Sequence, residues 1–259
     1  MPSILAVTLG NCNLKMAIAT REARAFYLGT PVQFPIEEIR ESRPKLARIL
    51  SEGNGEAMPM VVASVNPPAL DGFLRLARQV SRRKVLVAGQ DFLIPIRTKV
   101  HEPDGVGVDR LLAALAAYRR AQKECVVVDL GTAATVNAVR RDGTFLGGVI
   151  FPGLRMMARA LAQGTAQLAE VSLDEAAGSI GKTTQEAIRA GILHGTSAAI
   201  EGLIRDARWI VGSRAPVFVT GGDVMNIFPY VTDRFRNWCR YPDLVLEGLG
   251  IAYFGRQGR

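Results

Sequence analysis

An uninterrupted apolar stretch that ends in a carboxylate and a glycine constrains this chain most. Residues 125–135 run Cys-Val-Val-Val-Asp-Leu-Gly-Thr-Ala-Ala-Thr, and the residues before Asp129 are apolar. A continuous apolar run of this length suits a strand that is covered on both faces, as in α/β proteins. Gly131 lets a ligand approach the backbone closely, because it carries no Cβ. The pattern therefore predicts a buried strand with a binding site at its end.

The chemistry of that site stays open at this point. A carboxylate beside the hydroxyls of Thr132 and Thr135 suits a hydrated cation, or a phosphate with its counter-ion. The same Asp-x-Gly-Thr pattern is also an ordinary exit from a strand into a turn, in which the Asp bonds to nearby backbone. Taken alone, the segment favours neither interpretation.

The order of the other predicted elements is that of an α/β protein. A hairpin (4–7 and 16–19) opens the chain, and a second strand pair (135–139 and 144–150) resembles it. This repetition indicates an internal duplication and predicts two similar lobes, 1–118 and 119–259, with a ligand cleft between them. The remaining predicted elements are a helix over 35–51 that Pro44 splits, a strand at 60–65, a helix to about residue 83, a strand at 84–88, helices at 111–118, 154–161, 185–194 and 197–211, a strand at 217–223 and a helix at 244–252.

Composition narrows the class of protein. The 259 residues are 48% hydrophobic and 22% charged, which is typical of a soluble globular chain. Residues 1–7 lack a basic region before their apolar run and no apolar stretch reaches membrane length, so we expect a cytoplasmic protein. Cys12, Cys125 and Cys239 have no paired spacing, so neither a disulfide framework nor a zinc knuckle is expected. The net charge of +8 comes from scattered basic residues, which makes nucleic acid a minor hypothesis beside a phosphorylated substrate.

Two segments before residue 125 carry candidate binding groups. The Gly10-Asn11 turn can expose backbone N–H groups and Lys15 can add a point charge for phosphate, although a plain hairpin with a surface lysine has the same pattern. Asp109 and Arg110 stand where a helix begins, so the Asp can act as a base on a hydroxyl and the Arg can bind a carboxylate. A capping Asp with a solvated Arg is the simpler alternative there.

The later segments contain one candidate for nucleotide binding and one pattern that only resembles a phosphate loop. The Gly221-Gly222 turn after a buried strand lets a nucleotide lie against backbone. Gly181-Lys182-Thr183 lacks the first glycine and the preceding strand of a phosphate loop, so that interpretation is rejected, while the helix that follows has an N-terminus open to a polar ligand. His101 and His194 are too far apart in sequence to form a metal cluster by themselves.

Several motifs together resemble one known family. The matching segments are Gly10-Asn11 with Lys15, Gly107-Val108-Asp109-Arg110, Asp129-Leu130-Gly131-Thr132-Ala133-Ala134-Thr135, Phe145-Leu146-Gly147-Gly148 with Pro152-Gly153, and Thr220-Gly221-Gly222. Segments 161–168 and 242–249 extend the match over nearly the whole chain. In this combination the chain resembles type III pantothenate kinase, the group also named for the Bvg accessory factor.

The resemblance implies both a fold and an activity. The fold is α/β of the acetate and sugar kinase/actin type, with two ribonuclease-H-like lobes and ATP between them, in a homodimer. The family transfers the γ-phosphoryl group of ATP to the hydroxyl of pantothenate, the first step towards coenzyme A. It depends on Mg2+ and on a monovalent cation, K+ or NH4+.

The resemblance also assigns roles to residues of this sequence. It implies that Asp109 is the base on the pantothenate hydroxyl and that Asp129 holds the monovalent cation. ATP would contact Thr132, and Thr184 would touch pantothenate across the dimer interface. The pantothenate pocket would be lined by Gly107, Val108, Asp109 and Arg110, and the nucleotide would meet Thr8, Gly10, Asn11, Lys15, Gly221 and Gly222.

Three positions depart from the family pattern. The first phosphate motif of the family is Asp-x-Gly-Asn-(Ser/Thr), but this chain has Thr8 and Cys12 at its first and fifth positions. Losing a charge-neutralising contact in a water-poor site typically costs roughly a hundred- to a thousandfold in rate. Val100 stands where the family often has a tyrosine that contacts the substrate. These departures leave a second hypothesis open, a catalytically weak homologue that binds a ligand or partner and regulates.

Overall fold

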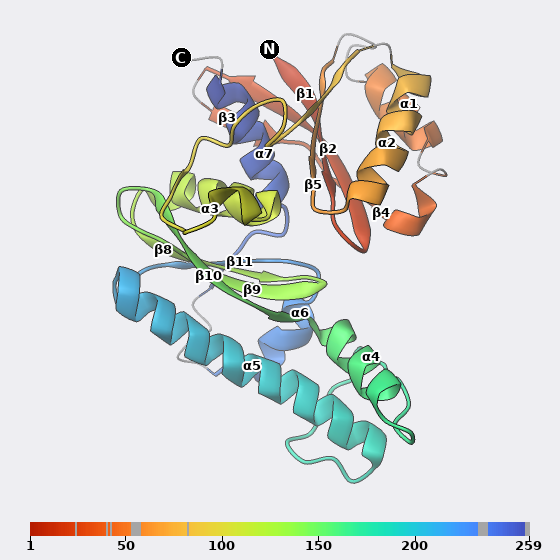
Figure 1. The fold of residues 1–259 in the computed structure, drawn as a ribbon, viewed down its shortest axis with the longest axis vertical. Coiled ribbons are helices and arrows are strands. Elements are labelled where there is room, and N and C mark those ends of the chain that lie inside the picture. Colours follow the sequence, from red (N-terminus) through yellow and green to blue (C-terminus); the bar gives the residue numbers. More distant parts are fainter. Residues whose placement is uncertain are drawn as a thin grey trace. The chain divides into compact units, whose positions relative to one another are not determined.

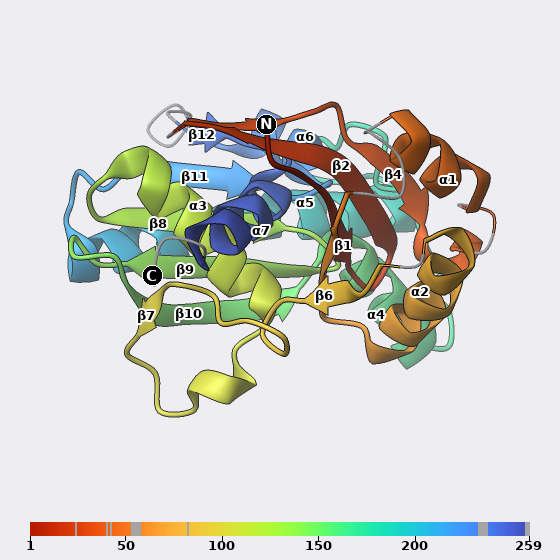
Figure 2. The same cartoon turned by 90° about the horizontal axis from the view of Figure 1, so that it is seen from above.

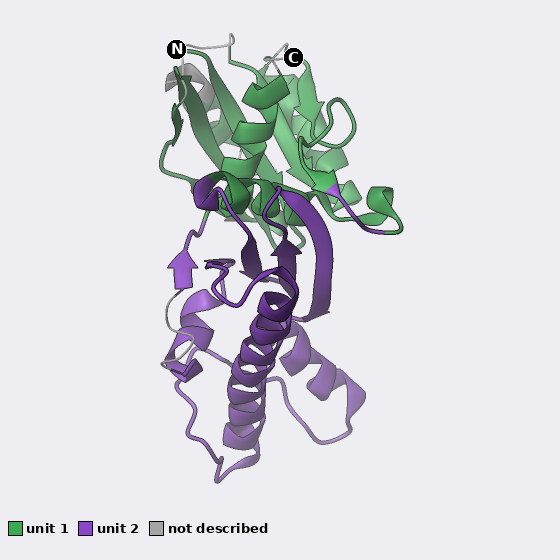
Figure 3. Ribbon diagram, turned by 90° about the vertical axis from the view of Figure 1, so that its left-hand side faces the viewer, with its two compact units in different colours: residues 1–97, 101–119, 243–259 green, residues 98–100, 120–242 purple. Residues whose placement is uncertain are grey.

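The chain divides into two units, which Figure 3 colours separately. The computed structural model describes residues 1–23, 25–39, 41, 43–52, 58–81, 83–232 and 238–256. Unit 1 comprises Met1–Arg97, His101–Arg119 and Asp243–Arg259, and unit 2 comprises Thr98–Val100 and Arg120–Pro242. The predicted lobes are 1–118 and 119–259. In the structure the segment that begins at Asp243 belongs to unit 1 instead, because its helix packs on the sheet of that unit.

Unit 1 is a mixed sheet with helices on both faces (Figure 1). The strand order is β3-β2-β1-β5-β6, and β4 also pairs with β2. Strands β2, β3 and β4 form antiparallel pairs, whereas β5 and β6 continue the sheet in parallel with β1. The elements are β1 (Ser3–Leu9), β2 (Asn13–Glu22), β3 (Ala25–Leu28), β4 (Val32–Pro35), α1 (Arg43–Glu52), β5 (Met60–Ser64), α2 (Pro67–Val80), β6 (Val85–Val87), α3 (Val108–Ala121) and α7 (Leu244–Gly255).

The side chains of β1 alternate between two apolar cores. Leu5 and Val7 join the cluster that includes residues of α1 and α2. Ile4 and Ala6 join the cluster that includes residues of α3 and α7. Since both faces are covered, β1 is apolar along its length rather than alternating in polarity. By the same alternation, the side chain of Thr8 projects from the face of the sheet that α7 covers.

Unit 2 repeats the arrangement of unit 1. Its sheet has the order β12-β11-β8-β9-β10-β7, with β8, β9 and β10 antiparallel and with β11 and β12 parallel to β8 (Figure 2). The elements are β7 (Arg97–Thr98), β8 (Cys125–Leu130), β9 (Ala133–Val139), β10 (Thr144–Pro152), α4 (Leu154–Gly164), α5 (Thr184–Val211), β11 (Val217–Thr220), α6 (Val224–Ile227) and β12 (Trp238–Arg240).

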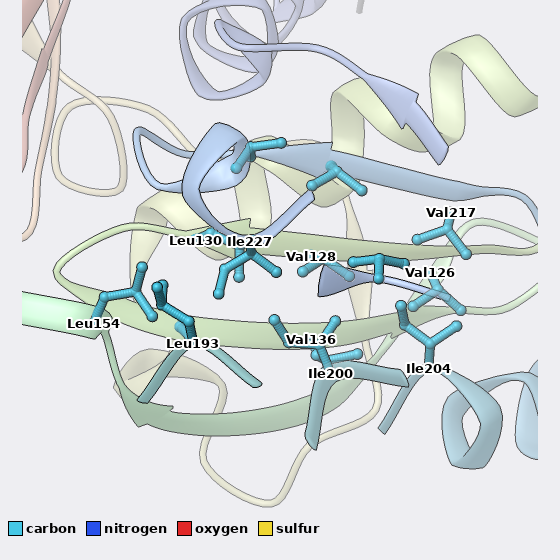
Figure 4. Packing of buried hydrophobic residues seen from close by; sticks show 14 of the residues in the cluster. Val126, Val128, Leu130, Val136, Leu154, Leu193, Ile200, Ile204, Val217 and Ile227 are labelled. Atoms are coloured by element: carbon cyan, nitrogen blue, oxygen red, sulfur yellow. The ribbon is translucent and has the colours of Figure 1, made fainter. Parts of the chain in front are cut away.

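One face of the unit 2 sheet packs against α5, as Figure 4 shows for Val128, Val136 and Ile200. These side chains are at most 3% exposed, and burying one such aliphatic side chain contributes about 1.5–3 kcal/mol. The predicted helices at 185–194 and 197–211 are one continuous helix of 28 residues. None of the helices within the described ranges is long and apolar enough to span a bilayer.

The predicted duplication is confirmed, but its register is corrected. Both units contain an antiparallel three-strand meander followed by two strands parallel to the first. In this topology the counterpart of the N-terminal hairpin is β8–β9, not the predicted pair at 135–139 and 144–150. Strands β8 and β9 are joined by the two-residue turn Gly131-Thr132. Strand β1 thus corresponds to β8, and Val-Thr-Leu-Gly at 7–10 matches Val-Asp-Leu-Gly at 128–131.

Candidate functional site

In unit 1, predicted site residues gather at the carboxyl ends of β1 and β5, the edge where open α/β sheets bind ligands. Thr8 pairs with Lys15 on β2 and with Ala63 on β5. Gly10 closes the turn by donating its N–H to the Asn13 carbonyl at 2.9 Å. The turn residue Asn11 is exposed, as a group that meets a ligand must be.

The start of α3 lies beside the same edge. Asp109 is in the first turn of α3, and its Oδ1 accepts a hydrogen bond from the Arg110 backbone N–H at 2.8 Å. A Cβ on Gly107 would lie 2.6 Å from that oxygen and 3.7 Å from Val65 Cγ1, and Val65 donates its N–H to the Leu9 carbonyl. Gly107 therefore makes room for the Asp109 carboxylate next to the end of β5.

The electrostatics around Asp109 suit a base. Burial raises the pKa of Asp109, and the Arg110 N–H and the Arg110 charge oppose this shift without cancelling it. Burial also lowers the pKa of Arg110, while the Asp109 charge raises it. Val108, the residue before Asp109, packs against the apolar cluster that includes residues of α3 and α7. A partly desolvated carboxylate of this kind accepts a proton more readily than a solvated one.

Lys15 forms an ion pair that the sequence did not reveal. Its Nζ lies 3.3 Å from Oδ1 of Asp243, and the two side chains are 27% and 24% exposed. Asp243 occupies the position before α7, yet its side chain makes no capping hydrogen bond there. The two residues stand 228 positions apart, so no local pattern could have predicted the pair. Lys15 is thus more than the surface lysine of a plain hairpin.

In unit 2, Asp129 stands at the carboxyl end of β8. Its neighbours across the sheet are Thr135 on β9 and Thr220 on β11. Its Oδ1 would be 3.5 Å from a Cβ on Gly131, so the carboxylate lies along the turn. The predicted strand that ends in a carboxylate, a glycine and hydroxyls is therefore confirmed. The Thr135 hydroxyl is already bonded to the Asn137 side-chain amide at 3.0 Å.

The turn after β8 is fixed against the start of α4. The Thr132 carbonyl accepts the Gly153 N–H at 3.1 Å. A Cβ on Gly153 would overlap the Gly131 and Thr132 carbonyl oxygens, so only glycine allows this approach. Thr132, which the resemblance assigns to ATP, is consequently held in a rigid turn.

A second turn, after β11, meets the same end of β8. Gly221 has φ +102°, and a Cβ at this position would overlap the backbone of Leu130. The Asp223 N–H donates to the Leu130 carbonyl at 3.0 Å. Among the residues that the structure describes, nothing lies within 4 Å of a Cβ on Gly222, which leaves its backbone open to a ligand. The predicted Gly-Gly turn thus exists and lies beside the Gly131 turn.

Asp223 is a site residue that the sequence reasoning missed. It lines a cavity of about 150 Å³ together with Arg155, Asp174 and Asn226. Burial raises its pKa, and the Arg155 charge and the Asn226 amide, 3.3 Å away, oppose that shift. Its position directly after the Gly-Gly turn was the available signal.

The N-terminus of α5, which the sequence predicts to be open to a polar ligand, carries a partial cap. The Thr183 hydroxyl accepts the Glu186 N–H at 3.2 Å, and Glu186 in turn accepts the Lys182 N–H at 2.7 Å. These bonds satisfy the N–H of Glu186, at the third helical position, and the N–H of Lys182, before the helix. The rejection of a phosphate loop is confirmed, because residues 166–183 form no strand before α5. Thr184 itself is exposed at the first position of the helix.

The carboxylates of the candidate site fit a cation that is bound partly by the protein and partly by substrate phosphates. In the described part of the chain, no three His, Cys, Asp or Glu side chains cluster to hold a metal. Mg2+ in phosphoryl-transfer sites is usually bound by one or two carboxylates plus substrate phosphates, so a site with a single carboxylate can still hold it. None of the three cysteines forms a disulfide, and burial raises the pKa of Cys125 to about 12, which makes its thiol inert.

Comparison with known proteins gives concordant matches. A family model described as type III pantothenate kinase matches residues 4–206. A type III pantothenate kinase from Thermomicrobium roseum is 32% identical over 254 residues, 96% of each chain.

Solved structures support the fold. A protein described as a Baf family transcriptional activator from Campylobacter jejuni has a TM-score of 0.60 at 19% identity, covering 99% of this chain and 100% of its own. The activator of the 2-hydroxyisocaproyl-CoA dehydratase from Clostridium difficile, solved with ADPNP, has a TM-score of 0.55 at 14% identity, covering 97% and 93%. The predicted class, α/β of the acetate and sugar kinase/actin type, is confirmed.

Proposed function

Because this chain belongs to the type III pantothenate kinase family, an ATP-dependent group of phosphotransferases, we propose that it phosphorylates pantothenate with Asp109 as the base. The observation that carries the assignment is the half-buried Asp109 carboxylate, which Gly107 leaves room for at the start of α3. Asp109 takes the proton from the pantothenate hydroxyl as the hydroxyl oxygen bonds to the γ-phosphorus, while the bond to the β–γ bridging oxygen breaks and ADP leaves.

Pantothenate meets the segment around Asp109. Arg110 can pair with the substrate carboxylate, because its guanidinium offers planar paired donors. Gly107 and Val108 contribute the wall of the pocket on either side of the carboxylate. Thr184 reaches the substrate from a second subunit of a homodimer, and its exposure at the start of α5 supports this role.

ATP meets the turns at the ends of the strands. Gly10, Asn11 and Lys15 of unit 1 and Thr132, Gly221 and Gly222 of unit 2 bind it, since each belongs to a strand-end turn or adjoins one. Mg2+ bound with the phosphates would neutralise their charge. Asp129 holds the monovalent cation, K+ or NH4+, at the end of β8, where Thr135 and Thr220 flank it.

The departures from the family pattern do not favour a regulatory protein. Val100 packs 3.4 Å from the Cβ position of Gly147, so it has a packing role of its own. Thr8 lacks the carboxylate of the family motif, but Asp109, Arg110, Asp129 and Thr132 remain. We expect an active kinase that works in the cytoplasm.

The test is ADP release from the purified protein with ATP, Mg2+, K+ and pantothenate. Turnover should require pantothenate and fall about 10²–10⁴-fold in Asp109→Asn, the range for losing a general base. Asp104→Asn is the control, because Asp104 is an exposed carboxylate five residues away on the same segment. A parent protein without turnover at millimolar ATP, or an Asp109→Asn variant as active as the parent, would refute the assignment.

A further inference from the structure

The duplicated fold exposes a missing carboxylate in unit 1. Strand β1 ends in Val-Thr-Leu-Gly where the equivalent β8 ends in Val-Asp-Leu-Gly. Thr8 therefore occupies the position that Asp129 occupies in unit 2. A neutral hydroxyl at this position leaves the phosphate-binding edge of unit 1 with Lys15 but with no carboxylate of its own from the strand.

Another carboxylate reaches the same face of the sheet. Thr8 and Lys15 are partners across β1 and β2, so their side chains project from one face. That face also carries Ile4, Ala6 and Ala17, which pack with residues of α7. Asp243 immediately precedes α7 and pairs with Lys15 at 3.3 Å. The carboxylate thus comes from the start of the covering helix and not from the strand.

Asp243 does not use its carboxylate for helix stability. A capping side chain at this position is typically worth about 1 kcal/mol, but Asp243 makes no such hydrogen bond. A partly exposed ion pair such as the one with Lys15 contributes only about 0–1 kcal/mol. The Oδ1 atom bonds to Lys15, and no hydrogen bond to Oδ2 is seen within the described ranges. The arrangement gains little for folding and leaves one carboxylate oxygen for a ligand.

We propose that Asp243 supplies the carboxylate that Thr8 lacks and positions the Mg2+ that accompanies the ATP phosphates. Lys15 anchors one oxygen of Asp243 and offers its charge to the phosphates, while the other oxygen faces the cation or its water. Mg2+ in such sites needs only one or two protein carboxylates, because phosphates and waters complete its shell. The inference rests on the proposed function, since it assumes that unit 1 meets ATP.

The test measures nucleotide binding rather than turnover. Asp243→Asn keeps a residue suited to the position before α7, so the fold should persist, as the melting temperature checks. Titration calorimetry with a non-hydrolysable ATP analogue should show about 10–100-fold weaker binding in Mg2+ and unchanged binding in EDTA. Thr8→Asp in the Asp243→Asn background should restore the Mg2+-dependent affinity. Asp91→Asn is the matched control, because Asp91 is also 24% exposed and paired with a lysine, Lys84.

Each result decides the question. Equal loss with and without Mg2+ would mean that Asp243 only orients Lys15, and an unchanged affinity would mean that it has no role; either overturns the proposal. Failure of Thr8→Asp to restore binding would also overturn it. Because pantothenate is absent from this experiment, a parent that binds the Mg2+ nucleotide but lacks kinase activity refutes the proposed function alone. A parent that binds no nucleotide refutes both.

Discussion

At the scale of single residues, burial raises the pKa of Asp109 although its neighbours favour the charged form. A carboxyl whose pKa is higher in the folded than in the unfolded chain stabilises the fold fully below the unfolded pKa. This contribution is lost as the pH rises through the folded pKa. At neutral pH the ionised Asp109 therefore lowers the free energy of unfolding, which is a cost that the proposed base imposes on the protein.

We predict that Asp109→Asn raises the free energy of unfolding at pH 7 while it abolishes turnover. The gain should shrink as the pH falls through the folded pKa towards the usual range of aspartate. Urea unfolding between pH 4 and 8 tests the sign. A variant that is less stable than the parent at pH 7 would mean that the carboxylate is well solvated or well paired.

Gly107 offers a second prediction at this scale. In Gly107→Ala the new Cβ would lie 2.6 Å from Asp109 Oδ1, so the carboxylate must move. A misplacement of about 1 Å can cost roughly a hundredfold in rate, and we expect kcat to fall by that order with little change in melting temperature. Gly105→Ala is the matched control, since its nearest neighbour, Glu102, lies 3.9 Å away. Equal rates in both variants would contradict the proposed role of Asp109.

At the scale of elements, glycines decide how the turns of unit 2 meet. Gly221→Ala would force an L side chain into φ +102° and into the Leu130 backbone, so we predict a loss of about 2–4 kcal/mol in the free energy of unfolding. Gly222→Ala, with nothing within 4 Å, should change it by less than about 0.5 kcal/mol. Paired denaturant titrations test this. Similar losses in both variants would show that the turn is not held against β8.

The long apolar or amphipathic elements were predictable, whereas the short edge strands were not. The split at Pro44 is confirmed, because α1 begins at Arg43 after a separate 3₁₀ turn at Ile36–Glu38. Strand β3 has only four residues, none of them buried, and β12 has three. Such short strands contain too few buried residues to show an apolar pattern, so their own sequences do not mark them.

The same distinction holds for the site. Asp109, Asp129, Gly131 and Gly221 follow strands or begin helices, so local patterns predicted them. The role of Asp243 depends on a partner on β2, and only the folded chain reveals it. The partial cap of α5 comes from Thr183 and Glu186, and their spacing of three residues is a signal of such a cap in the sequence.

At the scale of the whole molecule, the proposed homodimer predicts that two inactive variants complement each other. If Thr184 acts on the pantothenate of a second subunit, a mixed dimer of Thr184→Ala and Asp109→Asn contains one intact site. Refolding the variants together in equal amounts should restore about a quarter of the parent activity, because half of the dimers are mixed. Light scattering should give twice the 28.0 kDa of one chain. A monomeric mass, or no recovery from mixed dimers, would contradict the shared site.

The return of α7 to unit 1 has a consequence for synthesis on the ribosome. Leu246 and Leu249 share a core with Ile4 and Ala6, so the core that contains the first strand is complete only after the last helix has been translated. Apart from the short segment Thr98–Val100, unit 2 is continuous from Arg120 to Pro242, so it can close its core first. A premature stop codon just before α7 would therefore spare the later-made unit and leave the earlier-made one exposed to proteases and chaperones.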